Sequence, residues 1–345
     1  MQWGIIGSGS WATALAKLLT DNNHPVNWLL RTEEMVVHFS KRHHNPSYLR
    51  SVYFETELLS FDTDVCSVVE KSDCLLIAVP SAFVLDTLIN LPKNAFAGKK
   101  VVSAVKGILP HDNLLLNDYL AKEYNLPPEN YFTIMGPCHA EEVASEKLSY
   151  LTFSGFDSQT AEDLALYFKT NYLNTITNSD VYGVQYAAIL KNIYALGAGI
   201  AHGLEYGDNF LSVFIANSAD EMAGFLRKVG IKHIEVGVHE IDDPVTHKKT
   251  PNYAASVYLG DLLVTCYSLY SRNRTFGNMI GKGYSVKAAQ LEMKMIAEGY
   301  NASKSIYEIN KSIGYQMPVA ETIYKILWKN VKPSEGLKQI EEFLV

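Results

Sequence analysis

The sequence predicts an α/β fold in which a doubly wound sheet is followed by an all-helical C-terminal domain. In the first half of the chain, short and almost fully apolar runs alternate with longer stretches that can form helices. This alternation is typical of buried parallel strands whose sheet is covered by helices on both faces. A glycine-rich turn joins the first apolar run to the first helical stretch, and long helical patterns dominate from Val181 onward.

Five apolar runs predict the strands of the sheet. They are Trp3–Gly7, Val26–Leu30, Cys74–Val79, Val101–Val105 and Tyr131–Met135. The stretches Trp11–Thr20 and Ala82–Asn90 lie between them and are expected to form helices.

The second half of the chain predicts helices only. Between Tyr186 and Gly197 the apolar residues follow the i, i+3, i+4, i+7 spacing of one helix face. Further helices are expected over Asn209–Val229 and Lys287–Asn310. The change of pattern divides the chain into a first domain of residues 1–180 and a helical domain of residues 181–345.

Composition and charge argue against several classes of protein. A chain of 345 residues is long enough for two domains of ordinary size, and its net charge of −7 is unlike that of a nucleic-acid binder. The four cysteines are scattered without a CxxC pair, which indicates a reducing compartment. We expect no signal peptide, because no basic stretch followed by an apolar core opens the chain. The best apolar run, Tyr186–Ala201, falls short of the ~20 residues of a membrane helix. A cytoplasmic protein that does not span a membrane is therefore expected.

The glycine-rich turn predicts a dinucleotide site. The segment GSGSWA, residues 7–12, fits the pattern G-x-G-x-x-G/A, follows a strand and opens a helix. In this pattern Gly7 permits the tight turn and Gly9 lets a pyrophosphate approach the backbone at the positive end of the helix. The alternative is a tight strand-to-helix connection that binds nothing, but the context favours a Rossmann-like nucleotide site.

The residue that follows the second strand bears on the choice of cofactor. Arg31 stands there, and an arginine at this place can bind the 2′-phosphate of NADP. Glu33, two residues later, can instead hold the free ribose hydroxyl of NAD. Both cofactors stay open, and Arg31 slightly favours NADP.

Two lysines are candidates for chemistry. Lys106, followed by glycine, ends a strand at the sheet edge where doubly wound sheets bind ligands. Lys191 lies inside an otherwise apolar helix, where burial would lower its pKa and make it a usable general acid or base. The alternatives are a surface lysine at 106 and, at 191, a lysine whose charged end reaches water. Cys138 and His139 suggest a nucleophile and a base, but neighbouring residues rarely point at each other and hydride transfer needs no thiolate.

Two later segments supply further polar groups. The run GDLLVTC, residues 260–266, carries Asp261, which can pair with a lysine. The run SRNR, residues 271–274, combines two arginines, an amide and a hydroxyl, a set suited to a phosphate. The alternative for the second run is a solvated turn.

In this order, the motifs resemble the NAD(P)-dependent glycerol-3-phosphate dehydrogenases of the bacterial type. The resemblance covers nearly the whole chain. It is carried by GSGSWATALA at residues 7–16, AVPS at 78–81, AVKG at 104–107, GPCHAEE at 136–142, LKNIYALGAGIAHGL at 190–204, GDLLVTC at 260–266 and SRNRTFG at 271–277.

The resemblance implies a role for each domain and for named residues. Residues 1–180 would bind the dinucleotide, and residues 181–345 would bind the substrate and carry the catalytic lysine. Catalysis would depend on Lys191 as general acid/base, with Lys106 and Asp261. The implied cofactor contacts are Gly7, Gly9, Ser10, Trp11, Arg31, Lys106, Ala140, Arg272 and Glu298. The implied substrate contacts are Lys106, Gly136, Cys138, Lys191, Asn192, Asp261, Thr265, Ser271, Arg272 and Asn273.

The activity that the resemblance implies is reversible hydride transfer between NAD(P)H and dihydroxyacetone phosphate, giving sn-glycerol 3-phosphate for phospholipid synthesis. It also implies a homodimer formed through the helical domain, and no resident metal. Two other functions stay open: a dehydrogenase of the same plan acting on another hydroxy acid, and a non-catalytic NADP-sensing module.

The sequence also departs from the family pattern. Cys138 stands where the family usually has Ser or Thr, and Asn217 lies in a segment that differs from the usual Thr-Arg-Gly. The segment between Gly230 and Gly260 is longer than usual and contains three histidines, His233, His239 and His247. We interpret it as an elaborated surface loop, with metal binding by the histidines as the alternative.

Overall fold

The computed structural model describes residues 1–110, 113–231, 254–293 and 297–345. They form two compact units, Met1–Val181 (unit 1) and Tyr182–Val345 (unit 2). The three histidines at 233, 239 and 247 lie outside the described residues.

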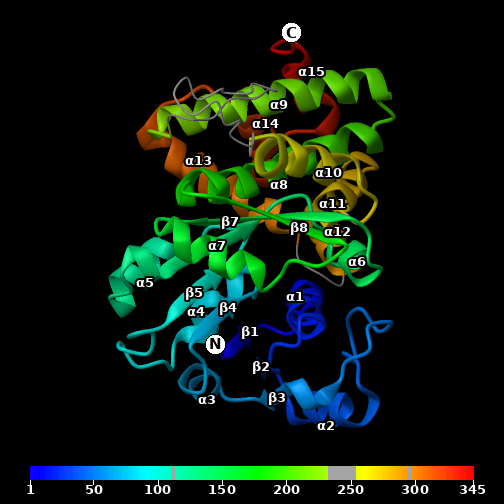
Figure 1. Ribbon diagram of the computed structural model, residues 1–345. Coiled ribbons are helices and arrows are strands. Elements are labelled where there is room, and N and C mark those ends of the chain that lie inside the picture. The colour runs from blue at the N-terminus through cyan, green and yellow to red at the C-terminus, as the bar shows by residue number, and fades with distance from the viewer. Residues whose placement is uncertain (111–112, 232–253, 294–296) are drawn as a thin grey trace. The chain divides into compact units, whose positions relative to one another are not determined.

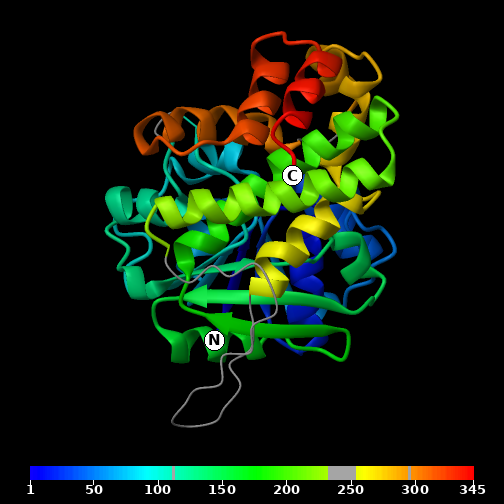
Figure 2. The same ribbon diagram turned by 90° about the horizontal axis from the view of Figure 1, so that it is seen from above.

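The described part of unit 1 is built on one eight-stranded sheet (Figure 1). Its strands are β1 (Trp3–Ile6), β2 (Val26–Leu29), β3 (Leu59–Asp62), β4 (Cys74–Ile77), β5 (Lys100–Ser103), β6 (Tyr131–Met135), β7 (Ser149–Gly155) and β8 (Leu173–Asn178). Their order is β3-β2-β1-β4-β5-β6-β7-β8, and all neighbours are parallel except β6 and β7. The arrows of β7 and β8 lie side by side in Figure 2.

Helices cover both faces of this sheet. They are α1 (Ser10–Asp21), α2 (Glu33–Arg42), α3 (Val65–Glu70), α4 (Val84–Leu88), α5 (Leu116–Tyr124), α6 (Ala140–Ala144) and α7 (Ser158–Leu166), with short 3₁₀ turns at Thr56–Leu58, Ser81–Phe83 and Pro128–Asn130. Successive strand residues point to opposite faces, so Ile5 packs in the core shared with α1 and α7, and Ile6 in the core shared with α4 and α5. Because both faces are buried, the central strands read as continuous apolar runs.

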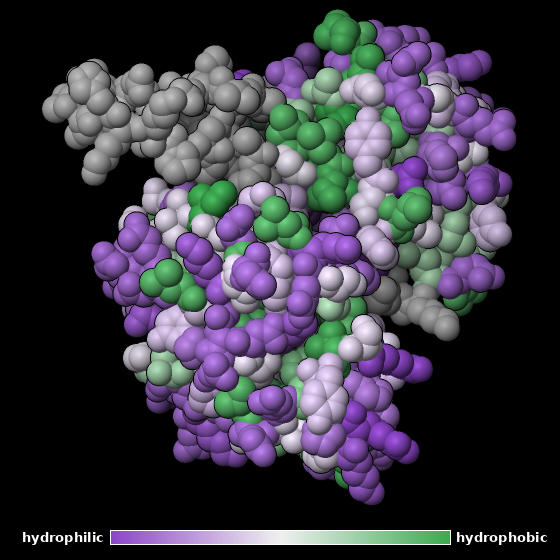
Figure 3. Space-filling view, turned by 45° about the vertical axis from the view of Figure 1, so that its right-hand side comes forward, coloured by the Kyte–Doolittle hydropathy of each residue, from purple (hydrophilic) through white to green (hydrophobic). Residues whose placement is uncertain are grey.

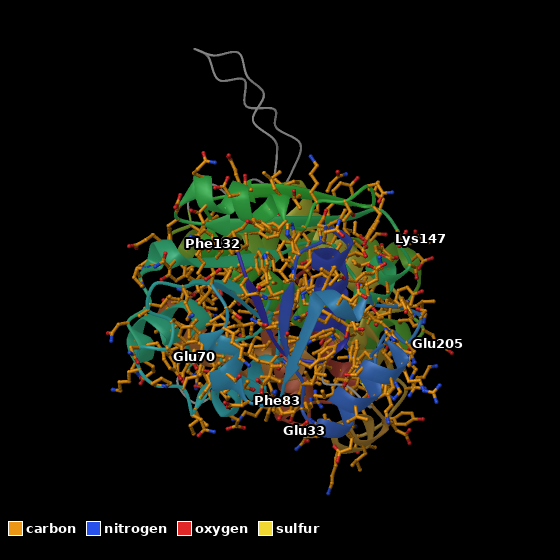
Figure 4. The ribbon with its side chains drawn as sticks, turned by 60° about the horizontal axis from the view of Figure 1, so that its bottom comes forward. Glu33, Glu70, Phe83, Phe132, Lys147 and Glu205 are labelled. Carbon is orange, nitrogen blue, oxygen red and sulfur yellow. The ribbon has the colours of Figure 1, made fainter. Side chains whose placement is uncertain are left out.

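Three strands were not expected from the sequence. β3 and β8 are the edge strands, and most of their residues are only partly buried, so they give a weak apolar signal. β7 is almost wholly buried but contains serine, threonine and glycine. Its antiparallel pairing brings Gly155 against the ring of Phe132, which Figure 4 labels; a Cβ on this glycine would lie 2.3 Å from that ring.

Unit 2 is helical over its described residues. Its elements are α8 (Val181–Gly203, which begins at the last residue of unit 1), α9 (Asp208–Lys228), a π-helix (Ala254–Gly260), α10 (Asp261–Tyr267), α11 (Arg272–Gly281), α12 (Val286–Glu292), α13 (Glu298–Ile313), α14 (Pro318–Trp328) and α15 (Pro333–Glu341). Within the described ranges of the chain, no helix combines the length and apolar character that crossing a membrane requires.

The expectation of one helix over Lys287–Asn310 was wrong. α12 ends before Met293, whose backbone is extended, and α13 begins after Ala297, which is also extended. A tertiary contact fixes this second start, because the backbone N–H of Gly299 donates to the Asn273 side chain at 2.9 Å. Helical periodicity in the sequence does not reveal such a contact.

Glycines bring α8 and α11 into backbone contact. A Cβ on Gly277 would lie 2.1 Å from the Leu196 carbonyl oxygen, and one on Gly199 would lie 2.1 Å from the Arg274 carbonyl oxygen. Neither oxygen belongs to a flexible side chain that could move aside. The contact fixes how the start of α11 sits against α8.

A buried carboxylate joins three helices of unit 2. Glu221 of α9 accepts hydrogen bonds from the backbone N–H groups of Val319 and Ala320 at the start of α14, at 2.7 and 2.9 Å, and from the Tyr194 hydroxyl of α8 at 3.1 Å. Burial raises the pKa of Glu221 to about 7, although the three hydrogen bonds act in the opposite direction.

Candidate active site

The fold itself requires glycine at one of the two glycine positions in the turn between β1 and α1, but not at the other. Gly7 has a φ of +134°, and a Cβ there would lie 2.7 Å from the Ala78 carbonyl oxygen, so the fold itself requires glycine. Gly9 has an ordinary φ of −81°, and a Cβ there would meet nothing within 4 Å. The protein's own packing therefore leaves space at Gly9 that a ligand can occupy.

The polar groups of the same turn fit a pyrophosphate. The hydroxyl oxygen of Ser8 and the indole Nε1 of Trp11 are buried without a hydrogen-bond partner. Unpaired buried donors are costly, and phosphate oxygens are acceptors that satisfy them. α1, which begins at Ser10, adds the free backbone N–H groups and the positive end of its dipole. The residues present thus fit a bound dinucleotide.

The structure brings two of the predicted cofactor residues of unit 1 together. The Lys106 ammonium lies 5.4 Å from the centre of the Trp11 ring, a cation–π distance, so the segment that follows β5 meets the first turn of α1. Arg31 is exposed just before Thr32, the residue that caps α2. The carboxylate of Glu33, labelled in Figure 4, accepts a hydrogen bond from the Thr63 hydroxyl at 2.7 Å.

The turn after β6 holds the remaining predicted residues of unit 1. Gly136 has a φ of +131°, and a Cβ there would lie 2.8 Å from the Tyr150 carbonyl oxygen, so glycine is required. Cys138 is buried and is not part of a disulfide, and Ala140 is the first residue of α6.

In unit 2 the predicted catalytic lysine is buried in an ion pair. The Lys191 ammonium contacts Asp261 Oδ1, and the two side chains are 5% and 2% exposed. The carboxylate favours the charged form of the lysine, which is the form that can donate a proton. The second carboxylate oxygen, Asp261 Oδ2, is buried without a hydrogen-bond partner. It is an acceptor that a substrate hydroxyl would satisfy.

An amide pair connects the next two predicted residues. Asn273 Nδ2 donates to Asn192 Oδ1 at 2.8 Å, and Asn273 Oδ1 accepts from the Gly299 N–H at 2.9 Å. An amide nitrogen carries two hydrogens, so Asn273 keeps one for a ligand. Glu298, a predicted cofactor contact, is the first residue of α13, beside Gly299.

The remaining predicted residues of unit 2 lie on α10 and at the start of α11. The Thr265 hydroxyl donates to the Asp261 carbonyl oxygen at 2.6 Å, within its own helix. Ser271 caps α11 by accepting from the Arg274 N–H at 3.2 Å, and Arg272 is the first residue of that helix. Asn217, where the sequence departs from the family pattern, is partly buried on α9 and bonds the backbone of Val345.

Sequence reasoning missed two residues that hold the glycine turn. The Trp28 indole N–H of β2 donates to the Gly7 carbonyl oxygen at 2.7 Å. Asn45, in the loop after α2, donates to the Ser8 carbonyl oxygen at 3.2 Å. Trp28 was visible only as one apolar residue of a strand, and nothing in the sequence pattern singled out Asn45. Among the described residues, no three His, Cys, Asp or Glu side chains are grouped as metal ligands would be.

A doubly wound sheet with a glycine cradle, together with a helical unit that carries a buried lysine–carboxylate pair, defines a nicotinamide-dependent dehydrogenase. Comparison with known proteins gives the family. Models of the N- and C-terminal domains of NAD-dependent glycerol-3-phosphate dehydrogenase match residues 2–161 and 180–338. The chain belongs to this family and is an oxidoreductase that uses NAD or NADP.

Individual relatives match this chain over most of their length. The glycerol-3-phosphate dehydrogenase [NAD(P)+] of Bacillus pumilus is 31% identical over 97% of this chain and 92% of its own. That of Streptococcus suis is 32% identical over 97% and 94%. The crystal structure of glycerol-3-phosphate dehydrogenase from Coxiella burnetii has a TM-score of 0.87 and 26% identity, and covers 99% of this chain and 98% of that one. The alternatives of another hydroxy-acid dehydrogenase or a cofactor sensor are not favoured.

Proposed function

We propose that the protein catalyses reversible hydride transfer between NAD(P)H and C2 of dihydroxyacetone phosphate, with sn-glycerol 3-phosphate as the product of reduction. The observation that carries this proposal is the buried Lys191–Asp261 pair, whose second carboxylate oxygen has no partner. In this proposal residues 1–180 bind the dinucleotide, and residues 181–345 bind the substrate and carry the catalytic lysine. Glycerol 3-phosphate made in this way would serve phospholipid synthesis.

The dinucleotide would be held by Gly7, Gly9, Ser10 and Trp11 at the start of α1, with Lys106, Arg31, Ala140, Arg272 and Glu298 as further contacts. When bound, it supplies the hydride for reduction. Arg31 is exposed, whereas the carboxylate of Glu33 is engaged with Thr63. This difference supports NADP somewhat more than NAD.

Proton transfer would fall to Lys191. As negative charge develops on the C2 oxygen, Lys191 Nζ donates a proton to it, and Lys106 adds a second positive charge that stabilises the oxyanion. Asp261 Oδ1 keeps the lysine in its charged form before the step, while Asp261 Oδ2 is available to a hydroxyl of the substrate. In the reverse direction a neutral Lys191 removes the proton of the alcohol.

The phosphate would be held at the start of α11. Arg272 offers a guanidinium fork, Asn273 one remaining amide hydrogen and Ser271 a hydroxyl hydrogen. Gly136, Cys138, Asn192 and Thr265 complete the proposed substrate contacts. Binding energy from the phosphate, which does not react, would fix C2 for the reaction.

We also propose a cytoplasmic homodimer. None of the four cysteines is part of a disulfide, as expected in a reducing compartment. Unit 2 exposes several large apolar side chains, with Leu269 exposed by 85%, and apolar residues gather in the upper half of the face in Figure 3. Exposed apolar surface of this kind is typical of protein interfaces.

The test is oxidation of NADH and NADPH, side by side, with three substrates. Dihydroxyacetone phosphate should support turnover, dihydroxyacetone should fail because it lacks the phosphate, and a 2-oxo acid should fail because it presents a carboxylate instead. Turnover with the 2-oxo acid alone would overturn the proposal in favour of a hydroxy-acid dehydrogenase. Tight dinucleotide binding without any turnover would favour a sensor.

A further inference from the structure

Asn45 is a fully buried polar side chain in the loop that follows α2, with an exposed fraction of 0%. A buried amide is costly unless its donors and acceptors are paired. The hydrogen bonds of the Asn45 side chain go to two parts of the chain, the start of α1 with the turn before it and the loop that contains Asn45 itself. Nδ2 donates to the Ser8 carbonyl oxygen at 3.2 Å and to Thr13 Oγ1 at 2.9 Å. Oδ1 accepts from the N–H groups of Ser47 and Tyr48 at 2.9 and 3.1 Å.

The donor side of Asn45 fixes the turn between β1 and α1. The Thr13 hydroxyl accepts a hydrogen bond from Asn45 and donates one to the Gly9 carbonyl oxygen at 2.9 Å. Asn45 therefore holds the Ser8 carbonyl oxygen directly and acts on the Gly9 carbonyl oxygen through the Thr13 hydroxyl, which adds to the bond from the Thr13 backbone N–H at 3.0 Å. The acceptor side ties Asn45 to its own loop in an Asx-type turn, so the anchor is itself fixed.

Holding these carbonyl oxygens also aims two N–H groups. A trans peptide is planar, with its C=O and N–H pointing in opposite directions. The Ser8 carbonyl belongs to the same peptide unit as the Gly9 N–H, and the Gly9 carbonyl to the same unit as the Ser10 N–H. Fixing each oxygen on the protein side turns each N–H to the opposite side, as a cradle for phosphate requires.

Gly9 makes such an anchor necessary. It lacks a side chain, and no atom outside its two chain neighbours lies within 4 Å of where its Cβ would be, so side-chain packing does not limit its backbone and the hydrogen bonds to the turn have to do so. A turn that moves freely has to be ordered by the ligand, and this ordering reduces affinity. We propose that Asn45, acting with Thr13, is a positioning residue that preorganises the turn for the dinucleotide pyrophosphate. The inference rests on the proposed function, because it assumes that a dinucleotide binds at this turn.

The matched control is Asn27 of β2. It is also buried, and its Nδ2 also makes two donor bonds, to the Lys71 carbonyl oxygen at 3.0 Å and to Ser72 Oγ at 3.1 Å. None of these partners belongs to the glycine turn. Asn45→Ala and Asn27→Ala each remove two donor bonds of a buried amide, and Asn45→Ala also removes the two bonds that Oδ1 accepts, so both should lower the melting temperature. Only the first should disturb the cradle.

The experiment measures the dissociation constants of NADH and NADPH for the full chain, by tryptophan fluorescence without substrate, together with melting temperatures. Asn45→Ala should raise the dissociation constant about tenfold, while kcat and the KM for dihydroxyacetone phosphate at saturating cofactor stay near wild type. Asn27→Ala should leave the dissociation constant unchanged. Equal dissociation constants for the two variants would overturn the inference.

A second variant guards against poor folding of Asn45→Ala. Thr13→Val keeps the shape of the side chain, but it removes the hydroxyl that links Asn45 to the Gly9 carbonyl oxygen. It should raise the dissociation constant roughly threefold, and its effect should be less than additive with that of Asn45→Ala, since both act on one turn. An unchanged constant in Thr13→Val would also count against the inference. Failure of the wild-type protein to bind either dinucleotide would instead reject the proposed function, and this inference with it.

Discussion

Replacing Lys191 by methionine should lower both the free energy of unfolding and kcat, and the two losses have different causes. The substitution removes one half of a buried ion pair and leaves the Asp261 carboxylate, only 2% exposed, without its counter-charge. Breaking a buried pair in this way costs about 3–5 kcal/mol, a large share of the roughly 5–15 kcal/mol that stabilises a typical domain. Loss of activity in this variant alone would therefore not identify the proton donor.

The double variant Lys191→Met/Asp261→Asn resolves this difficulty, because it removes both charges. Its free energy of unfolding in urea should recover most of what the single variant loses. Its kcat for dihydroxyacetone phosphate should remain ~10²–10⁴-fold below wild type, the usual cost of a lost acid/base group. The dissociation constant for NADH should stay near wild type, since the glycine cradle belongs to unit 1. A stable double variant whose kcat lies within about tenfold of wild type would refute the role of Lys191.

Three further changes test other parts of the molecule. Arg272→Ala should raise the KM for dihydroxyacetone phosphate roughly 10- to 100-fold, because it removes charge-assisted hydrogen bonds; an unchanged KM in steady-state kinetics would place the phosphate elsewhere. Gly277→Ala should lower the free energy of unfolding by about 1–3 kcal/mol, since its methyl carbon would lie 2.1 Å from the Leu196 carbonyl oxygen; a more stable variant in urea unfolding would contradict this contact. For Glu221, the pKa is raised from 4.5 in the unfolded chain to about 7 in the native state, so between these values the native state holds a proton that the unfolded chain has lost. Wild-type stability should thus fall as pH rises through this window, and Glu221→Gln should lack that slope when unfolding is compared at about pH 5 and about pH 8; equal slopes would show that Glu221 does not titrate there.

The fold was predictable wherever burial is complete. β1, β4 and β6 are buried on both faces, so every residue is apolar or small and the strand is visible in the sequence. β3 and β8, at the sheet edges, mix polar and apolar residues because solvent reaches them. The break between α12 and α13 could not be predicted for a different reason. It depends on a hydrogen bond from Gly299 to Asn273, and local periodicity carries no information about it.

The candidate site was predictable as a set of residue types but not as an arrangement. A lysine inside an apolar helix has a side chain that is either buried or reaches water, and for Lys191 the sequence favours neither of these two possibilities. The structure shows it buried against Asp261, which lies far along the chain. Asn273 was expected to bind phosphate, yet most of its hydrogen-bonding capacity goes to Asn192 and Gly299. Pairings of this kind arise only when distant helices pack.

The two glycines of the motif carry different information, one about the fold and the other about a ligand. Gly7 is required by the fold, since its backbone is left-handed and Ala78 leaves no room for a side chain. Any tight strand-to-helix turn of this geometry would need it, whether or not a ligand binds. Gly9 has an ordinary backbone and empty space around its missing side chain, so packing and conformation give no reason for glycine there. The same turn carries the buried Ser8 hydroxyl and Trp11 indole Nε1, which lack hydrogen-bond partners. The second glycine, rather than the first, is therefore the one that argues for a bound pyrophosphate.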